Sequence, residues 1–334
     1  MQERQGNDRA SLESAKCAEG LARKAADQTA SAGIELAAAL NRQASVLYRL
    51  GEVPAAMSLG ERALELSTEL GRSGRRERAG GLRALGVAHL MLGHFEQAYS
   101  YFDEARELFY ELGDRRGVSN MLLSMGESAR QRGDYTTAVQ LYEEALSIAR
   151  EIGEHTGQII SLNNLGGARL GLGDYTAAEA DLRQVITMAG PAGGLQVLPE
   201  TYSFLAAACL GQAKMEEALE AARRALELGQ QVENHELIAE AWRILGSVAA
   251  RLPQPITIEE QEFTATDCFT TSLRLFTESG MEAERARTLR DWARHEQERG
   301  IREQASAMME EAREIFSRLG MTRELERTQG EGEG

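Results

Sequence analysis

Small residues recur along the chain at a fixed interval of forty residues. A first register holds Gly86, Gly126, Gly166, Ala206 and Gly246. A second register lies seven residues later, at Gly93, Gly133, Gly173, Ala213 and Pro253, and a third lies twenty residues after that, at Gly113, Gly153 and Gly193. The same offsets recur upstream at Ala44, Gly51 and Gly71 and downstream at Ala293, Gly300 and Gly320. A period of this size indicates a stack of repeated supersecondary units.

The residues between these registers indicate that each unit is a pair of antiparallel helices. Alanines follow the second register by five residues, at Ala56, Ala98, Ala138, Ala178, Ala218 and Ala305. Two helices pack closely where small side chains meet and larger ones fill the flanks. The first glycine then lies at the helix crossing, the second in the tight turn, and the third ends the second helix. Because prolines number only 5, the pattern predicts an all-α fold.

The offsets also predict the boundaries along the chain. Residues 1–11 are expected to be a disordered N-terminus, and residues 12–33 a lone helix ended by Gly33, the second half of a truncated repeat. Seven repeats are expected over residues 36–323. Pro253 and Pro255 interrupt the sixth repeat, where we expect an insertion at about 253–259. The tail, 324–334, is expected to be disordered.

These motifs resemble the tetratricopeptide repeat family. Segment 134–146, Asp-Tyr-Thr-Thr-Ala-Val-Gln-Leu-Tyr-Glu-Glu-Ala-Leu, is similar to the family's second helix, and Leu165-Gly166 matches its Leu-Gly pair. The long repeats are similar to those of kinesin light chains, spindle-orientation adaptors and the sensor regions of bacterial signal-transduction ATPases. The chain departs from the pattern at Ala206, at Gly60 and at the insertion. The resemblance implies a right-handed superhelical solenoid whose first helices line a concave, peptide-binding face.

Composition restricts the classes of function. A net charge of −15 and a pI near 5.0 argue against binding to nucleic acid or to an anionic membrane. No apolar run approaches the ~18 residues of a membrane span. Cys17, Cys209 and Cys268 lie far apart without a CxxC spacing, which is typical of reduced thiols. We therefore expect a cytoplasmic protein.

Motifs for catalysis or metal binding are not found in the sequence. The five histidines, which fall at different repeat registers, are His89, His94, His155, His235 and His295. There is no HExxH motif, and the glycine-rich segment 167–173 follows no predicted strand, so it is not a phosphate loop. The sequence predicts no enzyme, no cofactor and no metal site.

Polar residues recur on one face of the predicted first helices, at positions around the first register. They are Asn41, Arg42, Arg83, Asn120, Glu127, Arg130, Asn163, Asn164, Ser203, Arg243, Arg290 and Arg294. Amides can pair with a peptide backbone, and arginine can bind a carboxylate through two parallel bonds. Asn163 and Asn164 are the strongest candidates, because the segment 162–166 resembles the kinesin-light-chain repeat, where such asparagines hold an extended peptide.

The sequence therefore predicts a protein- or peptide-binding scaffold or sensor, part of a larger bacterial signalling protein. Arginines gathered on one face of an acidic molecule favour an extended, acidic partner. One alternative is a receptor for a small peptide or effector that changes the shape of the superhelix. A third class, an enzyme, would require a catalytic constellation that the sequence does not contain.

Overall fold

The fold is that of a computed structural model, which describes residues 8–17, 19–20, 30–193 and 196–329. Residues 8–17 and 19–20 are helical. The longer helices that follow are α2 (Ala30–Arg49), α3 (Val53–Glu69), α4 (Arg75–Met91), α5 (Phe95–Glu111), α6 (Arg115–Arg132), α7 (Tyr135–Glu151), α8 (His155–Leu172), α9 (Tyr175–Gly193), α10 (Leu198–Gly211), α11 (Met215–Gln231), α12 (His235–Ala249), α13 (Ala265–Glu278), α14 (Glu282–Glu298), α15 (Arg302–Arg318) and α16 (Thr322–Gln329). A short 3-10 helix, η1 (Gly71–Gly74), joins α3 to α4.

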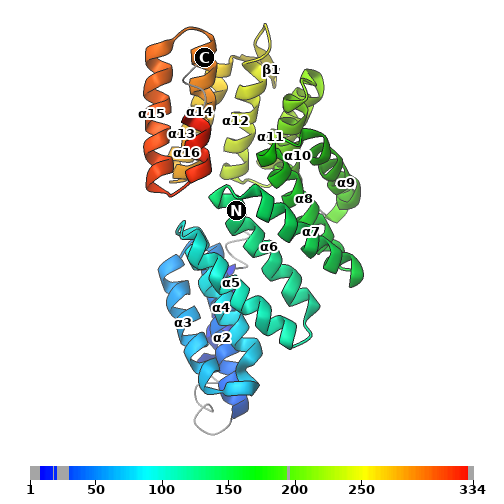
Figure 1. Cartoon of the computed structure of the whole chain (residues 1–334), viewed down its shortest axis with the longest axis vertical. Coiled ribbons are helices and arrows are strands. Elements are labelled where there is room, and N and C mark those ends of the chain that lie inside the picture. The colour runs from blue at the N-terminus through cyan, green and yellow to red at the C-terminus, as the bar shows by residue number, and fades with distance from the viewer. Residues whose placement is uncertain (1–7, 18, 21–29, 194–195, 330–334) are drawn as a thin grey trace. The chain divides into compact units, whose positions relative to one another are not determined.

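The helices pack in consecutive pairs, from α2 with α3 to α14 with α15 (Figure 1). The chain divides into two compact units, unit 1 with residues 1–131 and 140–158, and unit 2 with residues 132–139 and 159–334. Each unit is built from stacked antiparallel pairs, which confirms the predicted all-α fold class. Within the described ranges, no helix is both long enough and apolar enough to span a membrane.

The close crossing of the two helices in a pair explains the first glycine register. A Cβ atom on Gly126 of α6 would lie 2.5 Å from the ring of Tyr142 in α7, which is fully buried. Gly86 and Phe102 have the same relation in the preceding pair, again at 2.5 Å. Where the register holds Ala206, the residue at the same sixteen-residue offset is Ala222, and both are buried. A larger residue on one helix is thus matched by a smaller one on its partner.

The second register is a turn that needs a left-handed backbone. Gly93 has a φ of 76°, and its neighbour His94 closes the turn with a 2.8 Å bond to the carbonyl of His89. Ala213 occupies the same register and adopts a φ of 59° despite its side chain. The equivalent bond from Lys214 to Cys209 is 2.9 Å long. Because the turn geometry is kept without glycine, the repeat imposes the backbone conformation on this alanine.

Two of the predicted helix ends were wrong. The glycine that breaks the regular helix of α9 is Gly190, with φ 58° and ψ 178°, and not Gly193 as predicted, although the assigned bounds of α9 run on to Gly193. Gly33 does not end a lone helix but lies inside α2. A Cβ atom there would approach the side chain of Leu70 to 3.1 Å, so the glycine serves a helix contact.

The predicted disorder at the two ends was also wrong where the structure describes it. Residues 8–11 are helical, and Leu12 and Ala15 of the same segment are buried. The predicted tail contains α16, which begins at Thr322, forty residues after α14 begins at Glu282. It therefore occupies the position of a first helix in a further repeat. Residues 1–7, 21–29 and 330–334 lie outside the described ranges.

The insertion in the sixth repeat is a β-hairpin, which the sequence analysis did not predict. Strand β1 (Ile256–Ile258) pairs antiparallel with β2 (Gln261–Phe263). Glu259 and Glu260 form the two-residue turn with φ values of 46° and 65°. The hairpin is attached by apolar contacts, since Ile256 is 2% exposed and the ring of Phe263 lies 5.0 Å from that of Trp242. Runs of three residues are too short to give a strand pattern.

The crossing at Gly126 gives a direct test of the packing. We expect Gly126→Ala to lower the free energy of unfolding by about 1–3 kcal/mol, because the added methyl group overlaps the buried Tyr142 ring. Asn120→Ala, at an exposed position of the same helix, is the matched control and should change it by about 0.5 kcal/mol or less. Urea titration of the three proteins measures both values, and equal midpoints would contradict the assigned crossing.

Candidate functional site

Several predicted site residues connect neighbouring first helices. Asn163 of α8 is 1% exposed, donates a 2.8 Å bond to Glu200 of α10 and accepts a 2.7 Å bond from Thr201. Its amide is therefore engaged within the chain, and a ligand contact would require these bonds to break. Asn164 follows directly and is half-buried. Of this pair, we retain only Asn164 as a candidate ligand contact.

Arg243 and Arg290 lie at the same register as Asn163 and also bond to the next first helix. Arg243 of α12 contacts Asp291 of α14 at 3.2 Å. Arg290 of α14 binds Glu324 of α16, and it contacts Asp291 at 2.8 Å. Arg294 lies one turn further along α14, 3.7 Å from the carboxylate of Asp291. This register therefore holds successive repeats together, which sequence alone did not distinguish from ligand binding.

The predicted residues of α6 bond mainly within unit 1. Arg130 binds the carboxylate of Glu127 through two 2.7 Å bonds, and the Tyr142 hydroxyl donates to the same group at 3.1 Å. Burial opposes ionisation of Glu127, but Arg130 and these hydrogen bonds outweigh it, so the pKa of Glu127 is lowered. Asn120 is exposed on the same helix. In unit 2, the hydroxyl of Ser203 is buried without a hydrogen-bond partner among the described residues.

Three predicted residues line one cavity of unit 1, with a volume of about 810 Å³. This first-helix cavity lies between α2, α4 and the helical segment 8–17. It is lined by Ala10, Ser11, Ser14, Ala15, Asn41, Arg42, Ser45, Val46, Arg49 and Arg83. Because α2 and α4 are first helices, the cavity lies on the face where the sequence placed the ligand.

The first-helix cavity carries positive charge and one unsatisfied acceptor. Arg42 is exposed and has no ion-pair partner in the described ranges, whereas Arg49 binds Asp8 at 2.7 Å. Arg83 donates to the Ser45 hydroxyl at 2.9 Å, and burial lowers the pKa of its guanidinium. Asn41 is 9% exposed and donates to the carbonyl of Glu77, while its Oδ1 has no partner among the described residues. An N–H donor or an anion would satisfy these groups.

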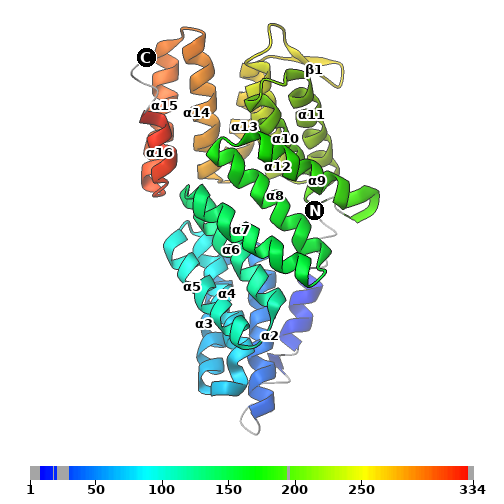
Figure 2. The same ribbon diagram turned by 45° about the vertical axis from the view of Figure 1, so that its right-hand side comes forward.

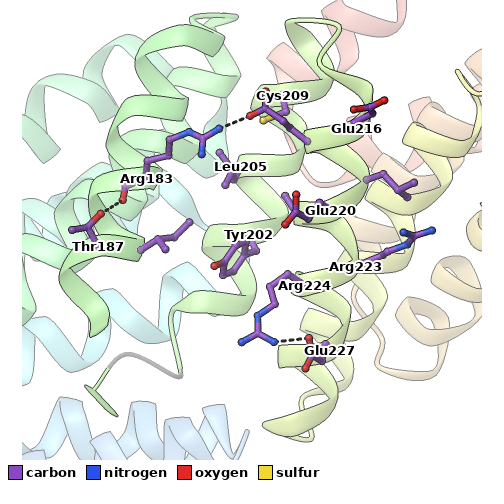
Figure 3. Close-up of a pocket in the computed structure, with 14 residues that line it drawn as sticks. Arg183, Thr187, Tyr202, Leu205, Cys209, Glu216, Glu220, Arg223, Arg224 and Glu227 are labelled. Carbon is purple, nitrogen blue, oxygen red and sulfur yellow. Dashed lines mark hydrogen bonds and ion pairs between the residues drawn. The ribbon is translucent and has the colours of Figure 1, made fainter. Parts of the chain in front are cut away.

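A second cavity lies in unit 2 between α9, α10 and α11 and has a volume of about 910 Å³. Figure 3 shows Arg183 and Thr187 from α9, Tyr202 and Leu205 from α10, and a row of charged residues from α11. The sequence did not predict this second-helix cavity. Two of its helices, α10 and α11, carry departures from the repeat pattern at Ala206 and Ala222, although neither alanine lines the cavity.

The charges of the second-helix cavity are largely paired, with glutamates in excess. Arg183 contacts Glu179 at 2.9 Å and Glu217 at 2.5 Å, and Arg224 contacts Glu227 at 2.5 Å. The remaining lining charges are Arg223, Glu216 and Glu220. This cavity therefore does not favour an acidic ligand.

One cluster at its edge offers three potential metal-ligand atoms, two carboxylate oxygens and one thiol sulfur. The ligand atoms of Glu179, Cys209 and Glu217 lie within 4.8 Å of one another. However, Lys214 contacts the Glu179 carboxylate at 2.7 Å, and burial together with the two glutamates raises the pKa of Cys209 to about 11. A cation would have to displace Lys214 and deprotonate the thiol, so we assign this cluster to ion pairing.

Two of the histidines lie close together, but the described residues do not complete a metal-ligand cluster around them. His89 and His94 are neighbours, with their Nδ1 atoms 3.3 Å apart, and the ring of Tyr101 stacks on His89 at 5.3 Å. Burial and the nearby His94 lower the pKa of His89. The described residues bring no carboxylate or cysteine close enough to this pair to form a metal-ligand cluster.

Comparison with protein families identifies the repeat. The family model described as tetratricopeptide repeat matches residues 35–111 and 117–189. These two stretches are tetratricopeptide repeats. The helix pairs of residues 198–318 continue the same alternation of first and second helices. No curated protein matches the chain significantly in sequence.

Solved structures share the tetratricopeptide-repeat fold across most of the chain. Aspartyl phosphate phosphatase F from Bacillus subtilis has a TM-score of 0.69 and 13% identity, covering 88% of this chain and 73% of its own. The Rap conjugation gene regulator of plasmid pLS20, in complex with the Phr* peptide, has a TM-score of 0.68 and 15% identity, with coverage of 88% and 78%. The quorum sensor NprR from B. thuringiensis, in its apo form, has a TM-score of 0.65 and 16% identity, with coverage of 92% and 83%.

Substitutions at the two neighbouring asparagines of α8 distinguish a structural role from a ligand-binding role. We expect Asn163→Ala to lower the free energy of unfolding by about 1–3 kcal/mol, because it removes two buried hydrogen bonds to α10. Asn164→Ala, on the half-buried neighbour, should change it by about 0.5 kcal/mol or less. Urea titration measures both, and a stable Asn163→Ala protein would contradict the bridging role.

Proposed function

We propose that the chain is a protein- or peptide-binding module that holds an extended, acidic segment against its first helices. The observation that carries this proposal is the first-helix cavity of unit 1, where Asn41, Arg42 and Arg83 surround a volume of about 810 Å³. The volume is large enough for several side chains of a bound segment. Its charge is positive although the chain as a whole carries −15.

The chemistry of the cavity suggests how such a segment would bind. The exposed guanidinium of Arg42 can form two parallel bonds with an aspartate or glutamate side chain. The buried Oδ1 of Asn41 can accept a backbone N–H, which would satisfy an acceptor that has no partner among the described residues. A nearby anion would also favour the charged form of Arg83, whose pKa is lowered by burial.

The solved structures with the same fold support a binding function. One of them, the regulator of plasmid pLS20, is in complex with the Phr* peptide, and another is a quorum sensor. We extend this peptide-binding role to the present chain, with residues of its own first helices as the contacts. We place no catalytic step in the chain, although one structure of this fold is an aspartyl phosphate phosphatase.

A second candidate function is a receptor for a small ligand in the second-helix cavity. The observation that favours it is the volume of about 910 Å³, which is in the range of small-molecule sites. Leu205, Leu219 and Ile186 provide apolar lining, and the excess of glutamates around them favours a neutral or cationic ligand. The two candidates thus differ in the charge of the ligand that they accept.

Peptides of opposite charge test the first candidate. A fluorescent glutamate-rich peptide should bind the chain at least about tenfold more tightly than a lysine-rich peptide of equal length. Arg42→Gln should weaken this binding about tenfold, because a bond between charged groups contributes about 1.5–3 kcal/mol. Fluorescence anisotropy measures the affinity, which should fall when the salt concentration is raised from about 50 to about 300 mM.

The control is Arg72→Gln, which removes an exposed arginine of η1 that is not part of the cavity lining. This variant should bind the glutamate-rich peptide like the unaltered chain. If Arg42→Gln and Arg72→Gln have the same effect, the first-helix cavity is not the binding site. Tighter binding of the lysine-rich peptide would instead favour the second-helix cavity.

A further inference from the structure

We propose that Arg287 and Arg290 form a carboxylate-binding site in unit 2, which α16 fills with its own Glu324 and which an acidic side chain of a partner can take over. The proposal rests on the proposed function, because it assumes an acidic partner on the first helices. It adds a second contact site, and it makes α16 an internal competitor for that site.

The site is built for one carboxylate group. Arg287 and Arg290 stand one turn apart on α14, and each is 8% exposed. The Nε of Arg287 donates to one oxygen of Glu324 at 3.2 Å, and Arg290 donates to the other oxygen. Glu324 is 3% exposed. The two arginines thus hold both oxygens of a single buried acid, as they could hold the carboxylate of another chain.

The surrounding charges explain why an acid is required there. Among the described residues, ion pairs join four arginines and three carboxylates of α12 and α14, so the side chains joined in this way carry one more positive than negative charge. The members are Arg243, Arg287, Arg290, Arg294, Glu240, Glu284 and Asp291. Burial opposes ionisation of Glu324, but Arg290 and Arg287 outweigh it and hold its pKa at about 2. An ionised acid from any source would balance this network.

The attachment of α16 is mainly polar, which favours displacement. Figure 2 shows α16 lying along α15. The helix has only eight residues, Thr322–Gln329, and Leu325 is its one large apolar side chain. Helices shorter than about 12–15 residues are marginal in water on their own, so α16 depends on its contacts. Arg313 of α15 donates to Thr328, which adds a further polar contact.

Release of α16 would also break contacts with distant parts of unit 2. The hydroxyl of Tyr135, at the start of α7, donates to Glu324 at 3.4 Å. The guanidinium of Arg327 lies 5.0 Å from the centre of the Tyr135 ring and donates to the carbonyl of Gly171 in α8. Glu324 therefore links α14 to the start of α7, two elements that are far apart in sequence. Occupation of the site by a partner would uncouple these elements.

Hydrogen exchange on the full chain tests the proposal. We expect Glu324→Gln to raise the amide exchange rates of residues 322–329 at least about tenfold, because the buried ion pairs of Glu324 with Arg287 and Arg290 are lost. Glu326→Gln, the matched substitution at an exposed position of the same helix, should leave these rates within about twofold. The same measurement on Tyr135 and its neighbours reports the uncoupling of α7.

A polymer probe tests displacement on the unaltered chain, so this arm does not depend on the folding of a variant. Poly-L-glutamate should raise the exchange rates of residues 322–329 at least about threefold, whereas poly-L-lysine at the same ionic strength should not. Unchanged rates with poly-L-glutamate, or with Glu324→Gln, would overturn the proposal and leave α16 as a fixed part of the fold.

The two proposals fail separately. The effect of Arg42→Gln on peptide affinity tests the first-helix cavity. The amide exchange rates of α16 test the Arg287–Arg290 site. If Arg42→Gln has no effect while poly-L-glutamate still releases α16, the cavity proposal alone is wrong. If α16 does not respond while Arg42→Gln weakens binding, only the carboxylate site of unit 2 is wrong.

Discussion

The close crossing of the two helices in each pair is the contact on which the rest of the structure depends. Tyr142 packs directly on Gly126 with no room for a Cβ atom between them, and the buried Ala206 and Ala222 hold the equivalent positions of a later pair. This contact fixes the rotation of each first helix about its own axis. The rotation in turn decides which side chains meet the next first helix and which line the cavity between α2 and α4. Arg42 lies two residues before Ala44, which holds this register in α2, so its position in the cavity follows from the register of small residues.

The fold could be predicted from sequence because the packing requirement repeats with a fixed period. The role of a single glycine was harder to predict, because a glycine serves equally well in a crossing, a turn or a helix end. Gly33 lies at a helix contact, and Gly190, not Gly193, breaks α9. The prediction of a disordered C-terminal tail was wrong for a different reason. The eight residues of α16 carry one large apolar side chain, so their pattern is that of a polar tail, and the ion pairs that order them come from α14.

The candidate site was harder to predict from the sequence, because the same face of the first helices both contacts the neighbouring first helix and lines the cavity. Asn41 and Asn163 occupy the same register, yet Asn163 uses both polar atoms on α10, whereas Asn41 keeps an unpartnered oxygen in a cavity. Only the identity of the facing residue, Thr201 in one case and the backbone of Glu77 in the other, distinguishes them. Arg290 was predicted as a ligand contact from its position alone. Its observed partner, Glu324, had been placed in the disordered tail, so sequence could not show that an acid of the same chain fills the site.

The first helices of unit 1 are the proposed binding surface for an acidic segment. Photo-crosslinking tests it most directly, with a glutamate-rich peptide that carries a benzophenone group and with the crosslinked residues mapped by mass spectrometry. We expect crosslinks within α2, α4 and residues 8–17, around the cavity that contains Asn41, Arg42 and Arg83. Crosslinks confined to α9 and α11, around Arg183 and Arg224, would contradict binding at the first helices and place the binding site on the second helices.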